Sequence, residues 1–213
     1  MRSKIIEEYK KSLRLSSDQR ALIVGTLLGD GCLETQNHGR SYRLKIEHAI
    51  DQKEYVDWKY SVLKDWVLTE PRIKAHMSYG KLRENYCFST VSHGELRFYG
   101  QQFYKNNEKI IPKMIAKMLS PLALAVWFMD DGSIKSKLHR ALVIHSQSFE
   151  RTDLEIIIEI LLKNYKIKAV LRKRSEGKGF VLSLAAESVD IFVKTIFPYI
   201  IPSMRYKLGN TIA

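Results

Sequence analysis

ALIVGTLLGDG at residues 21–31 and LALAVWFMDDG at residues 122–132 are two short apolar runs that end in the same Asp-Gly pair. Neither run contains a proline, and each is followed by a segment richer in polar residues. An apolar run of about ten residues is too short to span a bilayer and indicates a buried segment instead. We therefore expect two buried helices that end alike.

The residues that flank the first run predict where its helix begins and ends. Ser16 and Gln19 have the spacing of a capping box, and Gly31 can take the left-handed position that closes many helices. Small residues recur along one face of this helix, at Ala21, Gly25 and Gly29. A face without bulk allows a second backbone to approach closely, so we expect the two helices to pack against each other.

The second run has the same kind of boundaries. Ser120 can cap its N-terminus, Pro121 suits the first helical position, and Gly132 can end it. Both helices consequently carry an aspartate at the C-terminal end, Asp30 in the first and Asp131 in the second. The partial negative charge of a helix C-terminus disfavours a carboxylate there, so a positive partner is expected. Mg²⁺ suits carboxylate and carbonyl oxygens as ligands.

The two runs resemble the LAGLIDADG motif of homing endonucleases, placed twice in one chain as in the monomeric members of that family. Against the nine letters of the motif, residues 23–31 give IVGTLLGDG and residues 124–132 give LAVWFMDDG. Only the final Asp-Gly is kept strictly, but the joint occurrence in one basic chain is specific. The resemblance covers nearly the whole chain.

The composition fits a globular protein with a polyanionic partner. The 213 residues are 45% apolar, enough for a packed core, and 35 Lys and Arg outnumber 23 Asp and Glu for a net charge of +12. Cys32 and Cys87 are the two cysteines of the sequence, so neither a disulfide framework nor a zinc site is indicated. The N-terminus lacks the apolar core of a secretory signal, and we expect an intracellular protein that acts on nucleoid or organelle DNA.

Hydrophobic periodicity predicts the same order of elements twice, namely helix, two strands, helix, two strands, helix. After the first run we expect strands and helices at 32–36, 41–47, 52–67, 71–78, 81–88 and 95–104. After the second run we expect them at 133–137, 141–147, 151–165, 167–174, 180–186 and 188–197. The predicted organisation is an N-terminal repeat over residues 1–105, a linker over 106–119 and a C-terminal repeat over 120–213.

The predicted fold class is therefore α+β, with two pseudo-symmetric αββαββα repeats. The resemblance implies that the antiparallel sheets form a DNA-binding saddle and that the two Asp-Gly helices pack at the interface. Basic and polar side chains alternate with apolar ones along the predicted strands, which suits a face that neutralises phosphates and reads base edges. The candidate DNA-binding residues are Arg40, Arg43, Lys45, Arg72, Lys74, His76, Arg83, Asn85, Lys135, Lys137, Arg172 and Arg174.

The resemblance also assigns the chemistry. In the family the acidic residue at the position of Asp30 and Asp131 binds the metal, so both are expected to be catalytic and to hold Mg²⁺ or another divalent cation such as Mn²⁺. Backbone carbonyls of Gly29 and Asp130 are further candidate ligands. The Asp130 carboxylate is the alternative to that of Asp131, because consecutive helical side chains point about 100° apart and one ion cannot use both equally.

Three further residues resemble groups that surround the cut phosphates in similar endonucleases. They are Lys109 before Ile-Ile-Pro, Lys207 in Met-Arg-Tyr-Lys-Leu, and Gln147 in Ser-Gln-Ser-Phe. Alignment of the two repeats favours Lys117 over Lys109, so the family match and the internal repeat disagree at this point. Glu47 and His48 occupy the part of the first half that corresponds to Gln147.

The predicted function is a monomeric, site-specific endonuclease that makes metal-dependent double-strand breaks in a long asymmetric DNA target. The alternative is a binding protein of the same fold, either a maturase for intron RNA or a regulator that does not cleave. A basic protein that binds nucleic acid through charge alone explains the net charge but not the paired Asp-Gly ends. No flanking Ser, Thr or Cys nucleophile with a splicing context is visible, which disfavours an intein.

Overall fold

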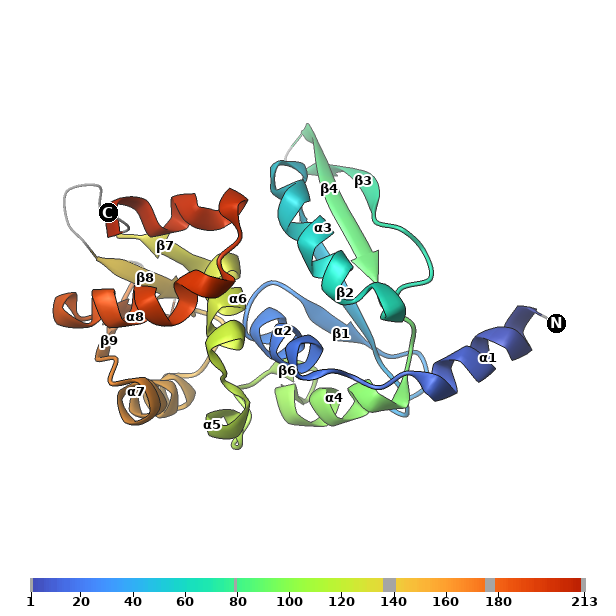
Figure 1. Cartoon of the computed structure of the whole chain (residues 1–213), viewed down its shortest axis with the longest axis horizontal. Coiled ribbons are helices and arrows are strands. Elements are labelled where there is room, and N and C mark those ends of the chain that lie inside the picture. Colours follow the sequence, from blue (N-terminus) through green and yellow to red (C-terminus); the bar gives the residue numbers. More distant parts are fainter. Residues whose placement is uncertain (1, 79, 136–140, 175–178, 212–213) are drawn as a thin grey trace. The chain divides into compact units, whose positions relative to one another are not determined.

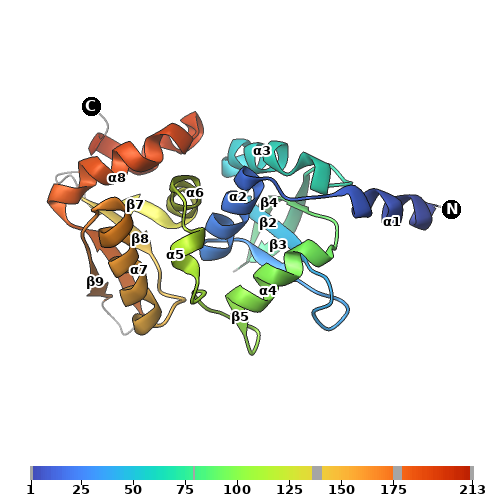
Figure 2. The same ribbon diagram turned by 60° about the horizontal axis from the view of Figure 1, so that its bottom comes forward.

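The protein forms two compact units, Met1–Gln101 and Gln102–Ala213, in a computed structural model (Figure 1). The structure describes residues 2–78, 80–135, 141–174 and 179–211. Each unit contains a four-stranded antiparallel sheet with helices against it, as Figure 2 shows from a second side. The α+β fold of two αββαββα repeats, expected from the sequence, is confirmed, with one repeat in each unit.

The first unit begins with a helix before the first apolar run, and short 3₁₀ turns flank its later helices. Its helices are α1 (Arg2–Ser12), α2 (Ser17–Leu28), α3 (Lys53–Val62) and α4 (Arg97–Phe103), with 3₁₀ turns η1 (Ile50–Gln52), η2 (Lys64–Trp66) and η3 (Gly94–Leu96). Its strands are β1 (Cys32–Glu34), β2 (Arg43–Ala49), β3 (Arg72–Ser78) and β4 (Lys81–Ser89). The helix expected over 52–67 is thus a shorter α3 followed by a 3₁₀ turn.

The second unit repeats this order after a short hairpin. The hairpin strands are β5 (Tyr104–Lys105) and β6 (Glu108–Lys109). The helices are α5 (Ile115–Met118), α6 (Pro121–Asp131), α7 (Arg151–Tyr165) and α8 (Val189–Ile196), with η5 (Ala186–Ser188), η6 (Phe197–Tyr199) and η7 (Pro202–Thr211). The sheet strands are β7 (Gly132–Ile134), β8 (Leu142–His145), β9 (Ala169–Lys173) and β10 (Phe180–Leu184).

The two sheets have the same topology. The strand orders are β1-β2-β4-β3 and β7-β8-β10-β9, and every neighbouring pair is antiparallel. Each sheet is therefore two hairpins joined through the second strand of each. In both units the strand that follows the Asp-Gly helix is the edge strand.

The cap of α2 forms as the sequence predicts. The Ser16 hydroxyl accepts a hydrogen bond from the Gln19 amide at 3.2 Å, and the Gln19 side chain accepts one from the Ser16 amide at 3.0 Å. In α6, the Ser120 hydroxyl accepts from the Ala123 amide, and Pro121 occupies the first helical position. Two orphan donors of α2 and one of α6 are thus satisfied locally.

Gly132 ends α6 as expected, whereas Gly31 has a different role from the one expected. Gly31 does not adopt a positive φ, and Gly132 has φ −76° and ψ 149°, which any residue can adopt. A Cβ on Gly31 would lie 2.2 Å from Thr26 Cγ2, and one on Gly132 would lie 2.3 Å from Phe128 Cδ2. The expectation of a left-handed Gly31 is wrong, because the glycine is needed for close approach of the chain to the preceding helical turn.

The alternation along β2 decides which side of the first sheet is core. Leu44, Ile46 and His48 are buried and point to the helical side, whereas Arg43, Lys45 and Glu47 are partly exposed on the other side. In the second unit Leu142, Ile144 and Leu182 have no exposed surface. Among the described residues, none of the helices combines the length and apolar character needed to cross a membrane.

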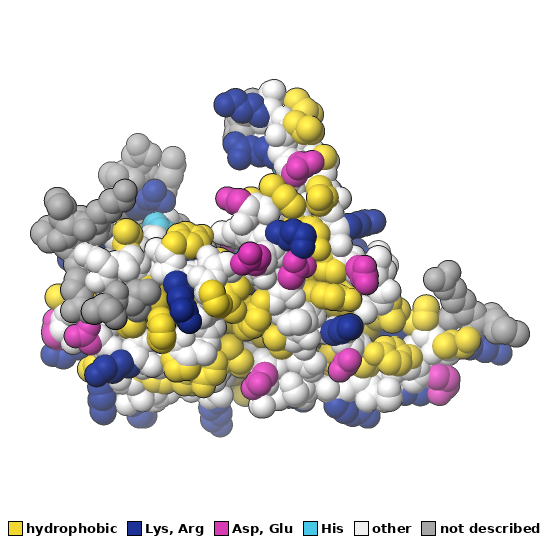
Figure 3. Space-filling model, turned by 45° about the horizontal axis from the view of Figure 1, so that its top comes forward, with side chains coloured by type: hydrophobic (Ala, Val, Ile, Leu, Met, Phe, Trp, Pro, Cys, Tyr) yellow, Lys and Arg dark blue, Asp and Glu magenta, His cyan; other side chains and the backbone are white. Residues whose placement is uncertain are grey.

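The tip of the β3–β4 hairpin departs from the expected pattern of one covered face. Ile73, Met77 and Leu82 share one side of the hairpin but are 54%, 66% and 67% exposed. Apolar and basic side chains are both visible on this hairpin, at the top of Figure 3. The alternation was correctly predicted, but no helix of the first unit extends over the tip.

Candidate functional site

Asp30 lies in the tight turn that joins α2 to β1. The Gly29 amide donates to the Gly25 carbonyl at 3.0 Å, and the Gly31 amide donates to the Thr26 carbonyl at 2.9 Å. These bonds fix the backbone on both sides of Asp30, whose side chain is 49% exposed. The carboxylate is therefore held in place while one side of it remains open to solvent.

His48 approaches Asp30 from the sheet. Its Nδ1 lies 3.6 Å from Asp30 Oδ2, and its side chain is only 3% exposed. His48 points inward because it continues the buried row of β2 that contains Leu44 and Ile46. The sequence placed His48 in the corresponding part of the first half, and the structure brings it next to Asp30.

Asp131 is the last residue of α6 and is partly exposed, whereas the neighbouring Asp130 is 8% exposed. The backbone carbonyl of Asp130 accepts a hydrogen bond from Lys207 Nζ at 2.6 Å. Lys207 belongs to η7, so the structure brings this sequence-predicted lysine to the end of the second Asp-Gly helix. An ammonium at a helix C-terminus is electrostatically favourable and offsets the nearby carboxylates.

The other sequence-predicted residues around the cut phosphates have separate positions. Lys109 is in β6, opposite Tyr104, and Lys117 is exposed on α5. Gln147 is in the turn after β8 rather than in the strand, where a Cβ on Gly179 would lie 2.7 Å from its carbonyl oxygen. The predicted strand 141–147 therefore ends earlier, at His145.

Strand register identifies the second-half residue that corresponds to Glu47. Lys45 pairs with Cys32, which follows Gly31, and Val143 pairs with Ser133, which follows Gly132. Two residues further along each strand are Glu47 and His145. His145 is not among the residues predicted from the sequence, because its position relative to the second Asp-Gly pair becomes informative only when the strand register is known.

His145 is held beside the end of α6. Its Nε2 lies 3.0 Å from Ser133 Oγ, within hydrogen-bond distance. Burial lowers the pKa of His145 from its ordinary value, and the positive charges of Arg174 and Lys207 lower it further. These effects favour the neutral imidazole over its protonated form.

Glu47 connects several basic and polar groups on the outer face of the first sheet. It accepts a hydrogen bond from Asn85 Nδ2 at 2.7 Å, forms an ion pair with Lys45 at 2.9 Å, and lies 3.9 Å from Lys74 Nζ. The Asn85 hydrogen bond lowers the pKa of Glu47, burial opposes this, and the lysines reinforce it. The hydrogen bond between Lys45 and Glu47 raises the pKa of Lys45. The cluster of these four side chains is charged and internally ordered at neutral pH.

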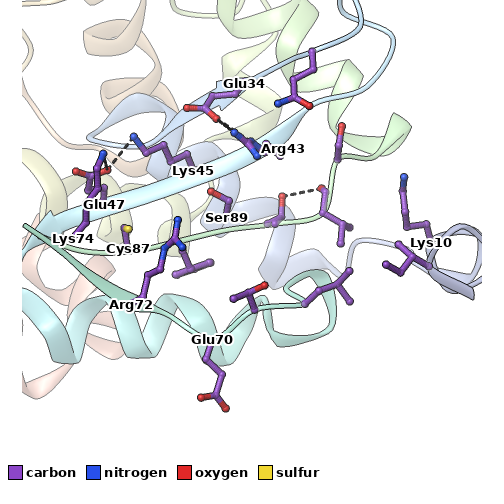
Figure 4. Close-up of a pocket in the computed structure, with 18 residues that line it drawn as sticks. Lys10, Glu34, Arg43, Lys45, Glu47, Glu70, Arg72, Lys74, Cys87 and Ser89 are labelled. Atoms are coloured by element: carbon purple, nitrogen blue, oxygen red, sulfur yellow. Dashed lines mark hydrogen bonds and ion pairs between the residues drawn. The ribbon is translucent and has the colours of Figure 1, made fainter. Parts of the chain in front are cut away.

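This face of the first unit is hollowed. Figure 4 shows the hollow, which has a volume of about 640 Å³, between β1, β2, β4 and the start of β3. Its charged lining residues are Lys10, Glu34, Arg43, Lys45, Glu47, Glu70, Arg72 and Lys74. Arg43 forms an ion pair with Glu34 at 2.7 Å. The basic side chains are thus oriented by carboxylates within a concave surface.

The remaining candidate DNA-binding residues lie on the same strands or at their ends. Arg40 is exposed in the β1–β2 turn, His76 lies opposite Arg83 in the β3–β4 hairpin, and Lys135 is exposed after β7. Lys137 lies outside the described residues. Arg72 pairs with Cys87 opposite Glu47, and Arg172 pairs with Val181 opposite His145, so these arginines are equivalent in the two sheets.

Comparison with known proteins gives a family match and several similar chains. The model of the LAGLIDADG DNA endonuclease family matches residues 20–192, which include both Asp-Gly helices and most of both sheets. Cytochrome b mRNA maturase bI2 of Saccharomyces cerevisiae is 33% identical over 89% of this chain and 47% of the maturase. The chain thus spans about half the length of that relative.

Two further similarities cover almost the full length of both partners. DNA endonuclease I-ChuI of Chlamydomonas applanata is 29% identical over 93% of this chain and 97% of the endonuclease. The solved structure of the homing endonuclease I-WcaI bound to its DNA recognition sequence is 26% identical, with a TM-score of 0.90. That match covers 96% of this chain and 92% of the I-WcaI chain.

Proposed function

Because this chain belongs to the LAGLIDADG DNA endonuclease family, we propose that it is a site-specific homing endonuclease that cuts both strands of a double-stranded DNA target. The observation that carries the proposal is the repetition of one arrangement in both units. In each, an aspartate lies at the junction between a helix and the first strand of a sheet with basic outer residues: Asp131 is the last residue of α6, and Asp30 lies in the turn two residues after the end of α2. Two carboxylates in one chain suit two cuts in an asymmetric target.

The proposed metal ligands are the carboxylates of Asp30 and Asp131, with the backbone carbonyls of Gly29 and Asp130 as further candidates. The residues fit a hard divalent cation, because Asp30 is half exposed at a helix end and Asp131 is partly exposed at another. A bound Mg²⁺ or Mn²⁺ supplies Lewis-acid stabilisation of the phosphate and lowers the pKa of an attacking water. The Asp130 carboxylate is buried and remains the alternative ligand in the second unit.

The groups around the aspartates have proposed roles of their own. Lys207, bound to the Asp130 carbonyl, carries a positive charge that can stabilise the phosphate of the transition state. The same role, charge stabilisation at a cut phosphate, is proposed for Lys109, and Gln147 is proposed as a polar group that orients water. Neutral His145 can accept a proton in that region, and ionised Glu47 occupies the equivalent place in the first unit.

The proposed DNA interface is the outer face of the two sheets. Lysines and arginines supply charge to the phosphates, and arginine and asparagine side chains can also make bidentate contacts with base edges in the major groove. The residues are Arg40, Arg43, Lys45, Arg72, Lys74, His76, Arg83, Asn85, Lys135, Lys137, Arg172 and Arg174. The Glu47 cluster supports this role, because it orients Lys45, Lys74 and Asn85 before any ligand binds.

A second candidate function is that of a maturase that binds intron RNA. The observation that favours it is the 33% identity to a cytochrome b mRNA maturase. Both aspartates are present here, which supports cleavage, although their presence does not distinguish the two functions. A regulator that binds DNA without cutting is the remaining alternative of the same fold.

The proposal is tested with a supercoiled plasmid that carries the uninterrupted insertion site of the gene. We expect linear product in Mg²⁺ and none in EDTA. Asp30→Asn and Asp131→Asn should each slow one strand by at least about a hundredfold, because each removes a carboxylate from one centre. Each single variant should therefore accumulate nicked circles, and the double variant should leave the plasmid supercoiled.

Glu159→Gln is the control, since Glu159 is an exposed carboxylate of α7 that does not line the hollow and is remote in sequence from both aspartates. It should linearise the plasmid like the wild type. Tight binding of the plasmid by the wild type without any strand cut, in Mg²⁺ and in Mn²⁺, would contradict the endonuclease and favour the maturase.

A further inference from the structure

A buried lysine lies behind the histidine that faces Asp30. Lys59 of α3 has no exposed surface, and its Nζ lies 3.2 Å from His48 Nε2. The same ammonium lies 4.3 Å from the centroid of the Tyr55 ring, which is also fully buried. Removing an ammonium from water is costly unless its donors find partners. A lysine buried this deeply therefore needs a specific hydrogen-bond acceptor.

The lysine determines which nitrogen of His48 carries the proton. An ammonium group has donors and no acceptor, so the nearby Nε2 of His48 must act as the acceptor. The proton of neutral His48 is then on Nδ1, the atom that faces Asp30 Oδ2 at 3.6 Å. The result is a chain of donors and acceptors. The Lys59 ammonium faces Nε2 of His48, and the Nδ1 proton of His48 faces the Asp30 carboxylate.

Among the described residues of the second unit, a serine stands at the position that corresponds to His48. The register that matches Glu47 with His145 matches His48 with Ser146. The Ser146 hydroxyl is fully buried and donates to the Phe180 carbonyl at 3.1 Å. The buried positions of α7, which corresponds to α3, are the apolar residues Leu154, Ile157, Ile160 and Leu161. The environments of Asp30 and Asp131 therefore differ chemically.

We propose that Lys59 is a positioning residue for Asp30, acting through the tautomer and orientation of His48. The inference rests on the proposed function, in which Asp30 is a metal ligand. Groups that contact a metal ligand from the side away from the metal fix its orientation. Their loss typically lowers metal affinity or activity by about 10 to 100-fold. Because Lys59 and His48 belong to the unit that contains Asp30, we expect the effect on the strand that Asp30 serves.

The first test needs neither metal nor DNA. The tautomer of His48 is read from long-range ¹H–¹⁵N spectra of the ¹⁵N-histidine-labelled full chain, above the ordinary pKa of histidine. His48→Gln identifies the signals. We expect the Nδ1–H tautomer in the wild type and a shift toward Nε2–H in Lys59→Met, which keeps the side-chain length but has no donor. Lys53→Met, an exposed lysine of the same helix, is the control and should leave the tautomer unchanged.

An unchanged His48 tautomer in a folded Lys59→Met protein overturns the proposal. Folding is checked by near-ultraviolet circular dichroism and thermal unfolding. This outcome does not depend on cleavage, so it is distinguishable from failure of the endonuclease function. If the wild type cuts no DNA, the tautomer shift alone still decides whether Lys59 orients His48.

The second test measures the two strands separately in single-turnover cleavage of end-labelled DNA. The strand served by Asp30 is the one that Asp30→Asn slows. Lys59→Met should slow that strand by about 10 to 100-fold and leave the other within about threefold. His48→Ala should have the same effect, and adding Lys59→Met to it should change little, because the lysine acts through the histidine. Equal slowing of both strands, or additive losses, contradicts the proposal.

Discussion

At the scale of single residues, the two aspartates could be identified from the sequence, because they end two similar apolar runs at matching positions. His145 and Lys59 could not. The correspondence of His145 with Glu47 depends on strand register across a turn of different length, which the sequence leaves open. Lys59 resembles any lysine of an amphipathic helix until the fold shows that its ammonium is buried.

His145 leads to a prediction about pH. Burial, Arg174 and Lys207 lower its pKa below the ordinary 6.5, so the unfolded chain binds a proton more readily than the folded chain. The contribution of His145 to folding stability is therefore fully present above the pKa that it has in the unfolded chain. This contribution is lost as the pH falls through the lower pKa of the folded state. His145→Gln should reduce the loss of unfolding free energy between about pH 7 and pH 5, measured by urea titration.

The control for this experiment is His76→Gln, which removes an exposed histidine from β3. It should keep the pH dependence of the wild type. If His145→Gln and the wild type lose the same free energy over this pH range, His145 is not held in its neutral form by its surroundings.

At the scale of elements, the capping residues specified the starts of α2 and α6 correctly, because a cap depends on neighbours three residues apart. The prediction for Gly31 was wrong, because the need for glycine comes from a close approach to Thr26. This approach arises only when the chain turns back after the helix. The exposed side of β3 and β4 was equally beyond the sequence. Alternation separates two faces of a hairpin but does not tell how far a covering helix extends.

Gly132 supports a stability prediction at this scale. Ala at this position has an acceptable backbone conformation, but its Cβ would lie 2.4 Å from the Phe128 carbonyl oxygen, which belongs to the helix and cannot rotate away. Gly132→Ala should lower the free energy of unfolding by about 1–3 kcal/mol, measured by urea denaturation.

Gly94→Ala is the matched control, since a Cβ there meets nothing within 4 Å. It should leave the stability within about 0.5 kcal/mol of the wild type. A Gly132→Ala protein as stable as this control would show that close approach is not the reason for the glycine.

At the scale of the whole molecule, the repeated order of elements was predictable because each half repeats the same hydrophobic periods and the same Asp-Gly landmark. The structure adds that Arg72 and Arg172 occupy equivalent positions in the two sheets. If both contact phosphates, Arg72→Gln and Arg172→Gln should each reduce the slope of log affinity against log salt by about one. Fluorescence anisotropy with labelled target DNA at several salt concentrations measures these slopes.

Arg151→Gln is the control for the salt series. Arg151 lies at the start of α7 and pairs with Glu155 at 2.8 Å, on a helix rather than a sheet. Its slope should equal that of the wild type. If neither sheet arginine changes the slope, the outer faces of the sheets do not contact the backbone of DNA.

If the outer face of the first sheet binds DNA as proposed, we expect the contacts of Glu47 to influence how long the protein stays on random sequence. A phosphate that approaches Lys45 or Lys74 in the proposed interface would compete with the Glu47 carboxylate, which pairs closely with Lys45 and lies 3.9 Å from Lys74. A random site has no group that replaces the lysines as partners of Glu47. At a site where a base amino group donates to Glu47, Lys45 and Lys74 become available to phosphates. We therefore expect the internal counterion to shorten the time that the protein spends at wrong sites during its search for the target.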